Sequence, residues 1–405
     1  MELLNVLKRL RQKPQGKIIL IVFDGLGGIP REPGGPTELE SARKPNLDAL
    51  AGEGTCGLLD NVLPGLTPGS GPAHLSLFGY DPLIFDIGRG LLGALGIGFP
   101  IQPGDLAVRV NFCTTDPATG FVTDRRAGRI ATETNEKLVA MLNAAVSIPG
   151  CEVFVRTEKE HRACVVFRAD GLYDAIAETD PQTTGKEPPR LAAALDARSE
   201  KAAGFGAEFA RQAAEVLKDQ HPANNLLMRG YARFEKIPLL TETYDLRFAA
   251  IATYPMYRGV ANLVGMDILP DAGDTMESEF ACLARHFADY DFFFLHIKKT
   301  DSYGEDGNWD AKVHVIEEAD ALIPRARALD PAVLCVTADH STPCVLKAHS
   351  WHPVPVAVWA RWGRPDSVPV FSERACAGGG LGRMRGIHLM PILVAHALGL
   401  EKYGA

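Results

Sequence analysis

The stretch KIILIVFDG, at residues 17–25, is a run of apolar side chains that ends in Asp24-Gly25. Such a run, rich in β-branched residues and without polar interruption, is typical of a central strand that is buried on both faces. It therefore predicts a strand over residues 17–23 with Asp24 at the carboxyl end. Open α/β sheets bind their ligands at that end of the strands, so Asp24 is a candidate site residue.

Two later stretches repeat this pattern. The run YDFFFLHI at 290–297 precedes Lys298 and Asp301, and the run AVLCVTA at 332–338 leads into Asp339-His340. Helical patterns lie between and beside these runs, at residues 44–52, 276–288 and 309–328. The alternation predicts an α/β fold, with a three-layer core and a mostly parallel sheet.

The middle of the chain has shorter predicted strands, at 107–114, 152–157 and 162–167, and a polar, turn-rich stretch at 178–189. We interpret this region as a smaller α+β domain inserted into the core. The predicted core comprises residues 1–105 and 250–405, and the predicted insert comprises residues 106–249.

Composition narrows the possible partners. Apolar residues make up 46% of the 405 residues and charged residues 23%, which is typical of an ordered globular chain. A net charge of -8 provides no general field for nucleic acid or an anionic membrane, so an anionic substrate needs a local cationic cluster. The eight cysteines form no CxxC pair, and the basic N-terminal stretch lacks the apolar run of a signal peptide. We expect a cytoplasmic protein that binds neither nucleic acid nor membrane.

Several potential metal ligands follow the predicted strands. Asp24, Asp301 and Asp339-His340 come just after strand ends, and His349 follows in the irregular segment KAHSWHPVP. Mixed carboxylate and imidazole ligands suit Mn or Zn pairs that clamp a phosphoryl group. Each residue alone also has an ordinary structural explanation, and their joint occurrence favours a metal site.

The segment LTPGSGPAHLSLFGY, at 66–80, contains a candidate nucleophile. Ser70 lies between two glycines, and Pro72 suits the first turn of a following helix. At a helix N-terminus, backbone N–H groups and the helix dipole favour an anionic oxygen or a phosphate. Simple helix capping is the alternative role of Ser70.

A basic cluster stands out in the predicted insert. The stretch from Asp124 to Arg129 contains three arginines in an otherwise acidic chain. Guanidinium groups bind phosphate and carboxylate through paired hydrogen bonds, although a solvated basic turn has the same composition. Further cationic candidates are Arg89, His161-Arg162, Arg229, Lys298 and Arg383.

Taken together, the motifs resemble the archaeal-type cofactor-independent phosphoglycerate mutases of the alkaline phosphatase superfamily. The resemblance covers nearly the whole chain and is carried by ILIVFDGLGG, KPNLDALAGEG, PGSGPAHLSLFGYDP, TDRRAGRI, KEHRACVVF, LLMRGYA, HIKKTDSYG and TADHSTPCVLKAHS. It implies an alkaline-phosphatase-like core with two divalent metal ions, usually Mn, with Mg, Co or Zn as alternatives.

The resemblance also implies roles for single residues. Ser70 would form the phosphoserine, and Lys298 would face the transferring phosphate. The first metal would bind Asp24, Ser70, Asp339 and His340, and the second would bind Asp301 and His349. The substrate would be gripped by Asp124, Arg125, Arg126, Arg129, His161 and Arg229.

The implied reaction converts 3-phosphoglycerate to 2-phosphoglycerate. The phosphoryl group would pass to Ser70, the bound glycerate would reorient, and the phosphate would return to the 2-hydroxyl. Closure of the insert over the core would exclude water.

The chain departs from the family pattern at three places. TDSYGEDG replaces TDxxGHDG, so Glu305 stands where a metal-binding histidine is expected. Ser70-Gly71-Pro72 replaces the start of GSDTAH, and Trp351-His352 replaces part of HSGDPVP. We expect Glu305 to ligate the second metal, which favours Mn or Mg over Zn; a damaged second site and replacement by His352 are the alternatives.

These departures leave two other functions open. A related metal-dependent phosphatase or phosphotransferase would act on another small phosphorylated metabolite. A homologue with an impaired second metal site would act as a binding protein.

Overall fold

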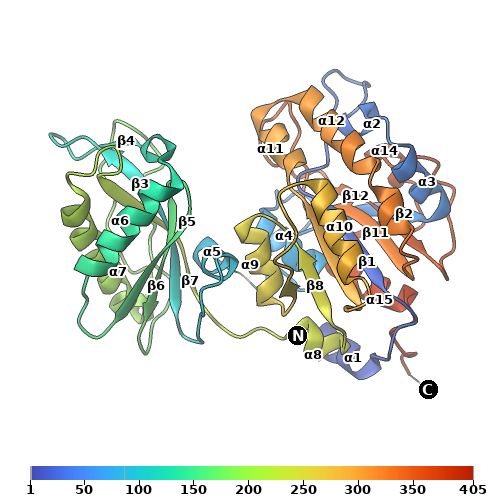
Figure 1. Cartoon of the computed structure of the whole chain (residues 1–405), viewed down its shortest axis with the longest axis horizontal. Helices are drawn as coiled ribbons and strands as arrows, with labels where there is room; N and C mark the ends of the chain where they lie inside the picture. Colours follow the sequence, from blue (N-terminus) through green and yellow to red (C-terminus); the bar gives the residue numbers. More distant parts are fainter. Residues whose placement is uncertain (1, 86, 405) are drawn as a thin grey trace. The chain divides into compact units, whose positions relative to one another are not determined.

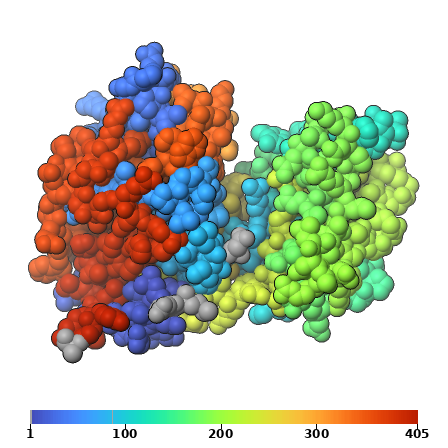
Figure 2. All heavy atoms as spheres, turned by 180° about the vertical axis from the view of Figure 1, so that it is seen from behind, coloured from blue at the N-terminus to red at the C-terminus, as the bar shows by residue number. Residues whose placement is uncertain are grey.

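The computed structural model describes residues 2–85 and 87–404, which form two compact units. The first unit combines the chain before residue 87 with the chain after Lys236, and the second comprises the residues between them. In Figure 2 the blue and red spheres of the two chain ends belong to the first unit, and the green spheres belong to the second. The second unit is thus an insertion in sequence as well as in structure.

The boundaries between these units lie at residues 86/87 and 236/237, whereas the predicted boundaries lie at 105/106 and 249/250. Helix α5 (Arg89–Gly96) belongs to the second unit, because it packs against β3 (Leu106–Thr115). Gly90 allows this close approach, since a Cβ at this position would lie 2.5 Å from the carbonyl oxygen of Ala107. At the other boundary, α8 (Leu240–Tyr244) and β8 (Phe248–Ile251) belong to the first unit.

The first unit is built on one large sheet (Figure 1). Among the described residues its strands follow the order β13-β2-β12-β11-β1-β10-β8-β9. Only β12 runs antiparallel to its neighbours, which confirms the predicted mostly parallel sheet. The remaining strands are β1 (Ile18–Phe23), β2 (Thr55–Asp60), β9 (Asp267–Ile268), β10 (Phe292–Ile297), β11 (Val333–Ala338), β12 (Val354–Ala360) and β13 (Gly382–Arg385).

The three strands predicted from apolar runs are confirmed as β1, β10 and β11, and every residue in them is buried. Strand β1 lies between the other two and is parallel to both. Burial on both faces explains why their sequences show no alternation of polar and apolar residues.

Helices pack against this sheet, among them α3 against β12, α10 against β10 and α15 against β11 (Figure 1). The predicted helix at 309–328 is two helices, α12 and α13, because Pro324 lacks the N–H that a continuous helix needs and instead lies in the first turn of α13. None of the described helices is long and apolar enough to cross a bilayer. The helices are α1 (Glu2–Leu10), α2 (Glu38–Ser41), α3 (Pro45–Glu53), α4 (Ser70–Leu77), α9 (Pro255–Leu263), α10 (Met276–His286), α11 (Lys299–Asp306), α12 (Trp309–Asp320), α13 (Ile323–Arg327), α14 (Glu373–Cys376) and α15 (Leu389–His396).

The second unit is an α+β domain with an antiparallel sheet, as predicted. Strand β3 alternates: Val108 and Val110 face the apolar core with α6 and α7, whereas Arg109 and Asn111 point to the opposite face. The other elements are β4 (Val122–Asp124), α6 (Thr132–Ala145), β5 (Glu152–Lys159), β6 (Arg162–Arg168), α7 (Glu200–Leu217) and β7 (Asn225–Arg233).

Candidate active site

Strand register brings the predicted carboxylates together at one edge of the large sheet. The last residue of β1, Phe23, lies beside Ile297 of β10 and Ala338 of β11. The residues that follow these three strand ends are therefore neighbours. They include Asp24 and Asp339, which are separated by more than 300 positions in the chain.

Asp24, Asp339 and His340 form the first group of potential metal ligands. All three are fully buried, and one ligand atom from each lies within 4.8 Å of the others. Nε2 of His340 lies 3.3 Å from Oδ1 of Asp24 and 3.2 Å from Oδ2 of Asp339. Those two carboxylate oxygens have no hydrogen-bond partner among the described residues. Buried, unpartnered carboxylate oxygens beside an imidazole nitrogen fit a divalent cation.

The electrostatics of this group support the same interpretation. Burial and the charge of Asp339 raise the pKa of Asp24 far above its ordinary value, although Lys298 opposes the shift. Burial also raises the pKa of Asp339. Two carboxylates that disfavour ionisation in each other's presence need a strong positive charge to be stable as anions.

A second group of ligands shares His340 with the first. Asp301, His340 and His349 again place ligand atoms within 4.8 Å of one another. Oδ1 of Asp301 lies 3.5 Å from Nε2 of His349, and the rings of His340 and His349 are stacked with centroids 3.6 Å apart. Thr342 donates a hydrogen bond of 2.9 Å to Oδ1 of Asp301 and contacts Nδ1 of His340 at 3.0 Å. This threonine links the two groups.

The candidate nucleophile lies beside the shared histidine. Ser70 is the first residue of α4, with Gly69 as the N-cap, so the predicted position at a helix N-terminus is confirmed. Its Oγ lies 3.0 Å from Nε2 of His340. The Ser70 hydroxyl therefore lies within reach of a metal held by the first group.

Lys298 supplies the positive charge of the site. Its Nζ donates hydrogen bonds of 2.7 Å to Oδ2 of Asp24 and 2.6 Å to Oδ2 of Asp301. Burial opposes the charged form, but the two carboxylates raise the pKa of Lys298 above its ordinary value. The ammonium group is thus held between the two ligand groups, and Tyr257 adds a short hydrogen bond to the same oxygen of Asp24.

Two residues of the altered motifs lie outside both ligand groups. Glu305 is exposed on α11, one turn after Asp301, and belongs to neither group of ligands found among the described residues. His352 places its Nδ1 3.0 Å from Oγ of Ser350, and neither group contains it. The arrangement gives no support to the prediction that Glu305 ligates the second metal.

The second unit carries a cationic cavity of about 170 Å³. It lies on the face of the antiparallel sheet to which Arg109 and Asn111 point. His161 is buried at its wall, where burial and the neighbouring arginines lower the pKa of the imidazole to about 4. The cavity is lined by Arg89, Arg109, Asn111, Arg125, Arg126, His161, Arg162 and Arg229.

Acidic residues fix two of these arginines. Asp180, in the turn-rich stretch, accepts hydrogen bonds of 2.9 and 2.7 Å from Nε and Nη2 of Arg125. The same carboxylate lies 3.3 Å from Nη1 of Arg229, which also contacts Glu178 at 3.4 Å. Burial opposes ionisation of Asp180, yet the hydrogen bonds from Arg125 hold its pKa below the ordinary value. These contacts hold the guanidinium groups at the cavity.

Two predicted substrate-binding residues do not line the cavity. Asp124 instead shapes the turn that presents the arginines, because its carboxylate accepts hydrogen bonds from the N–H groups of Arg126 and Gly128. Arg129 is exposed and lies outside the cavity lining.

Comparison with known proteins gives a consistent result. The sequence profile of the 2,3-bisphosphoglycerate-independent phosphoglycerate mutase family matches residues 51–224. A Thermus thermophilus protein named as a probable 2,3-bisphosphoglycerate-independent phosphoglycerate mutase is 53% identical to this chain, with 100% of both chains covered. A protein of the same name from Deinococcus radiodurans is 49% identical, again with 100% of both chains covered.

Solved structures agree with these sequence matches. The cofactor-independent phosphoglycerate mutase from Thermoplasma acidophilum is 31% identical with a TM-score of 0.71, covering 94% of this chain and 100% of its own. A protein from Pyrococcus horikoshii is 32% identical with a TM-score of 0.82, covering 97% of this chain and 100% of its own. The chain belongs to the 2,3-bisphosphoglycerate-independent phosphoglycerate mutases. The predicted family is confirmed.

In this member of the phosphoglycerate mutase family, sequence reasoning alone does not identify three residues at the cationic cavity. Arg109 and Asn111 lie within the largely apolar run of β3, and their spacing of two residues, which places them on one face of the strand, is the signal that could identify them. Asp180 was interpreted only as part of a polar turn. Its pairing with Arg125, 55 positions earlier in the chain, depends on the fold of the whole domain and cannot be predicted from the local sequence.

Proposed function

We propose that this protein interconverts 3-phosphoglycerate and 2-phosphoglycerate through a phosphoserine at Ser70, with two divalent metal ions bound in the core. The observation that carries the proposal is the 3.0 Å contact between Oγ of Ser70 and Nε2 of His340, the histidine shared by both ligand groups. Helix capping does not explain this hydroxyl, because Gly69 is the N-cap of α4 and no side chain caps the helix. Family membership supports the substrate assignment.

The residues present fit the proposed metal ions. Asp24, Ser70, Asp339 and His340 would hold the first, and Asp301 and His349 the second. Because these ligands are carboxylate, hydroxyl and imidazole groups, Mn is our first choice, ahead of Mg, Co and Zn. When bound, the ions would supply positive charge beside the Ser70 hydroxyl and the transferring phosphoryl group. Glu305 has no place in this ligand set.

The proposed reaction consists of two displacements at phosphorus. Oγ of Ser70 attacks the phosphorus of 3-phosphoglycerate, and the bond to the 3-oxygen breaks, so that the 3-oxygen receives the proton that Ser70 loses. The glycerate then reorients, its 2-hydroxyl attacks the phosphoserine, and Ser70 recovers its proton. Lys298 lies beside Asp24 and Asp301, where its ammonium group stabilises negative charge on the phosphoryl oxygens.

The cationic cavity of the insert accounts for the substrate class. A phosphoglycerate carries both a phosphate and a carboxylate, and clustered guanidinium groups bind both kinds of anion. Arg125 and Arg229 are held in place by Asp180, so less side-chain entropy is lost when the substrate binds. We also propose a cytoplasmic location, which the eight free cysteines support.

A product assay with purified protein and added Mn²⁺ tests this function. We expect 3-phosphoglycerate to be converted to 2-phosphoglycerate without added 2,3-bisphosphoglycerate, and Ser70→Ala to abolish the conversion. Ser76→Ala is the matched control, because Ser76 lies on the same helix and its buried hydroxyl has no hydrogen-bond partner among the described residues. Accumulation of inorganic phosphate instead would identify a phosphatase, and absence of turnover with fewer than two metal ions bound would identify a binding protein.

A further inference from the structure

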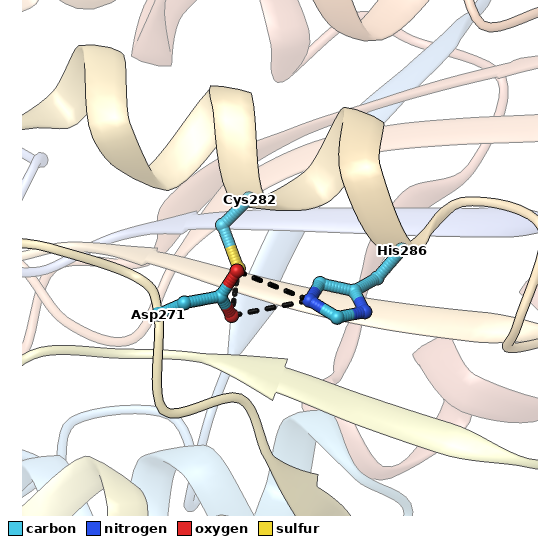
Figure 3. A group of neighbouring side chains, drawn as sticks. All are labelled: Asp271, Cys282 and His286. Carbon is cyan, nitrogen blue, oxygen red and sulfur yellow. Dashed lines mark hydrogen bonds and ion pairs between the residues drawn. The ribbon is translucent and has the colours of Figure 1, made fainter.

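A third group of potential metal ligands lies in the first unit, formed by residues other than those of the proposed catalytic centre (Figure 3). Cys282 and His286 are one turn apart on α10, and Asp271 lies in the segment after β9. One ligand atom from each lies within 4.8 Å of the others. Figure 3 shows the thiol, the imidazole and the carboxylate directed toward one another.

The spacing of these atoms suits tetrahedral coordination. Sγ of Cys282 lies 3.4 Å from Oδ1 of Asp271, and Nε2 of His286 lies 3.1 Å from the same oxygen. Ordinary Zn–S, Zn–O and Zn–N bond lengths with tetrahedral angles place sulfur and oxygen about 3.6 Å apart, and nitrogen and oxygen about 3.4 Å apart. These two distances are therefore about 0.2 and 0.3 Å shorter than the tetrahedral values, and the thiol and the imidazole offer ligand atoms within 4.8 Å of each other.

Neighbouring side chains contact two of the candidate ligands: Arg285 contacts Asp271, and Asp289 contacts His286. Nε of Arg285 donates a 2.9 Å hydrogen bond to Oδ2 of Asp271, and Nη2 of Arg285 donates another to the backbone carbonyl of Asp271. The thiol contacts Oδ1, and Nε2 of His286 contacts both oxygens, at 3.1 Å from Oδ1 and 3.2 Å from Oδ2. On the other side of the His286 ring, Nδ1 lies 3.5 Å from Oδ2 of Asp289. A carboxylate behind a histidine is the usual arrangement that orients an imidazole toward a metal.

The chemical types of the three candidate ligands favour Zn²⁺ over Mg²⁺ and Ca²⁺. A thiolate with an imidazole and a carboxylate suits Zn²⁺, whereas Mg²⁺ and Ca²⁺ prefer oxygen ligands alone. Asp271 and His286 are partly exposed, with 42% and 30% of their side chains accessible, so water can reach a fourth coordination position. We propose that Asp271, Cys282 and His286 form a Zn²⁺ site that joins the end of α10 to the segment after β9, separate from the catalytic metal ions.

Cobalt binding to the full chain tests this proposal, because Co²⁺ bound by a thiolate gives a strong near-ultraviolet charge-transfer band. The proposed catalytic ligands include no cysteine, so Co²⁺ in that centre gives no such band. We expect the band in the unmodified protein, its loss in Cys282→Ser and His286→Asn, and its decrease when Zn²⁺ is added in competition. Asp289→Asn should weaken Co²⁺ binding about tenfold to a hundredfold while the band is retained at saturation.

Two controls make the result specific. Cys344→Ser, which removes another buried thiol, should keep the band, and so should Asp301→Asn, which alters the proposed catalytic centre. Circular dichroism and conversion of 3-phosphoglycerate in the presence of Mn²⁺ should be unchanged in His286→Asn. The proposal is wrong if the unmodified protein shows no band with excess Co²⁺, or if the band persists in both Cys282→Ser and His286→Asn.

Discussion

The hydroxyl oxygen of Ser70 lies 3.0 Å from Nε2 of His340, although 270 positions separate the two residues in the chain. The same nitrogen lies 3.3 Å from Asp24 and 3.2 Å from Asp339. On the other side of the ring, Nδ1 contacts Thr342 at 3.0 Å, which fixes the imidazole with Nε2 toward the site. A single ring thus connects the nucleophile with both ligand groups.

Replacing His340 should therefore affect metal binding and catalysis together. For His340→Ala we expect Mn²⁺ affinity to fall at least about a hundredfold and turnover to fall at least about a thousandfold, since the loss of a ligand exceeds the tenfold to hundredfold effect of its supporting groups. Calorimetric titration with Mn²⁺ and the product assay measure the two effects. Chelation with EDTA should stop turnover of the unmodified protein, and added Mn²⁺ should restore it. His314→Ala, at an exposed position of α12, should change neither quantity.

Helix α11 offers a test of the second ligand group within one helix. Asp301 is buried beside Lys298 and His349, whereas Glu305 is exposed four residues later. We expect Asp301→Asn to remove most of the activity and one equivalent of bound metal. Glu305→Gln should leave turnover and metal content within about twofold, because no ligand group found in the described part of the chain includes that side chain. A large loss of turnover or bound metal in Glu305→Gln would show that Glu305 is a metal ligand.

The arginine cavity should control substrate affinity more than the chemical step. Arg229→Ala removes one charged hydrogen-bond donor, worth about 1.5–3 kcal/mol, so KM for 3-phosphoglycerate should rise roughly tenfold to a hundredfold. The turnover number should change far less, since binding the substrate and the transition state equally affects only KM. Steady-state kinetics separate the two effects. Arg211→Ala is the control, because Arg211 is exposed on α7 and forms an ion pair with its helix neighbour Glu208, outside the cavity lining.

The candidate metal ligands could be found from the sequence more readily than the residues of the cationic cavity, for a physical reason. Asp24 and Asp339 follow strands buried on both faces, whose unbroken apolar runs mark both the strand and its carboxyl end. The cavity residues lie on an antiparallel sheet with one polar face, where a single arginine within a strand resembles any solvent-facing residue. Arg109 acquires its role only because α5 and β7 bring Arg89 and Arg229 beside it.

The domain boundaries also depend on contacts that the local sequence does not show. Helix α5 follows the core motifs closely in sequence, so the sequence pattern places it in the predicted core, whereas it packs in the second unit. Its position is decided by Gly90, whose missing side chain lets the helix backbone lie against β3. A contact of this kind depends on the partner strand, which the local pattern of residues 87–98 does not reveal.

A close backbone approach also makes Gly25 critical to the metal centre. Gly25 has φ +64°, and a Cβ there would lie 2.5 Å from Oγ1 of Thr342 and 2.9 Å from Cα of Asp301. Gly25→Ala should therefore displace the residues that link the two ligand groups, with a loss of turnover of at least about a hundredfold. Gly34→Ala is the matched control, because Gly34 has φ +82° with nothing within 4 Å of its Cβ position. Both variants carry the left-handed backbone cost of about 1–2 kcal/mol, so similar activity losses would contradict the steric explanation.

Glu279 should make the stability of the protein depend on pH. It is 4% exposed on α10, and burial raises its pKa to about 8, although Lys299 opposes the shift. Below the unfolded-state pKa, about 4.3, the carboxyl group is protonated in both states and has no effect on this dependence. As the pH rises toward 8 the unfolded state loses this proton while the folded state keeps it, so stability falls by up to about 1.4 kcal/mol per pH unit.

Glu279→Gln removes this titration, so the variant should gain on the order of 2–4 kcal/mol relative to the unmodified protein between pH 5 and pH 8. Urea unfolding at both pH values measures the difference, and Glu277→Gln, at an exposed position of the same helix, should show no comparable change. An equal stability difference between Glu279→Gln and the unmodified protein at both pH values would show that Glu279 titrates normally in the folded state.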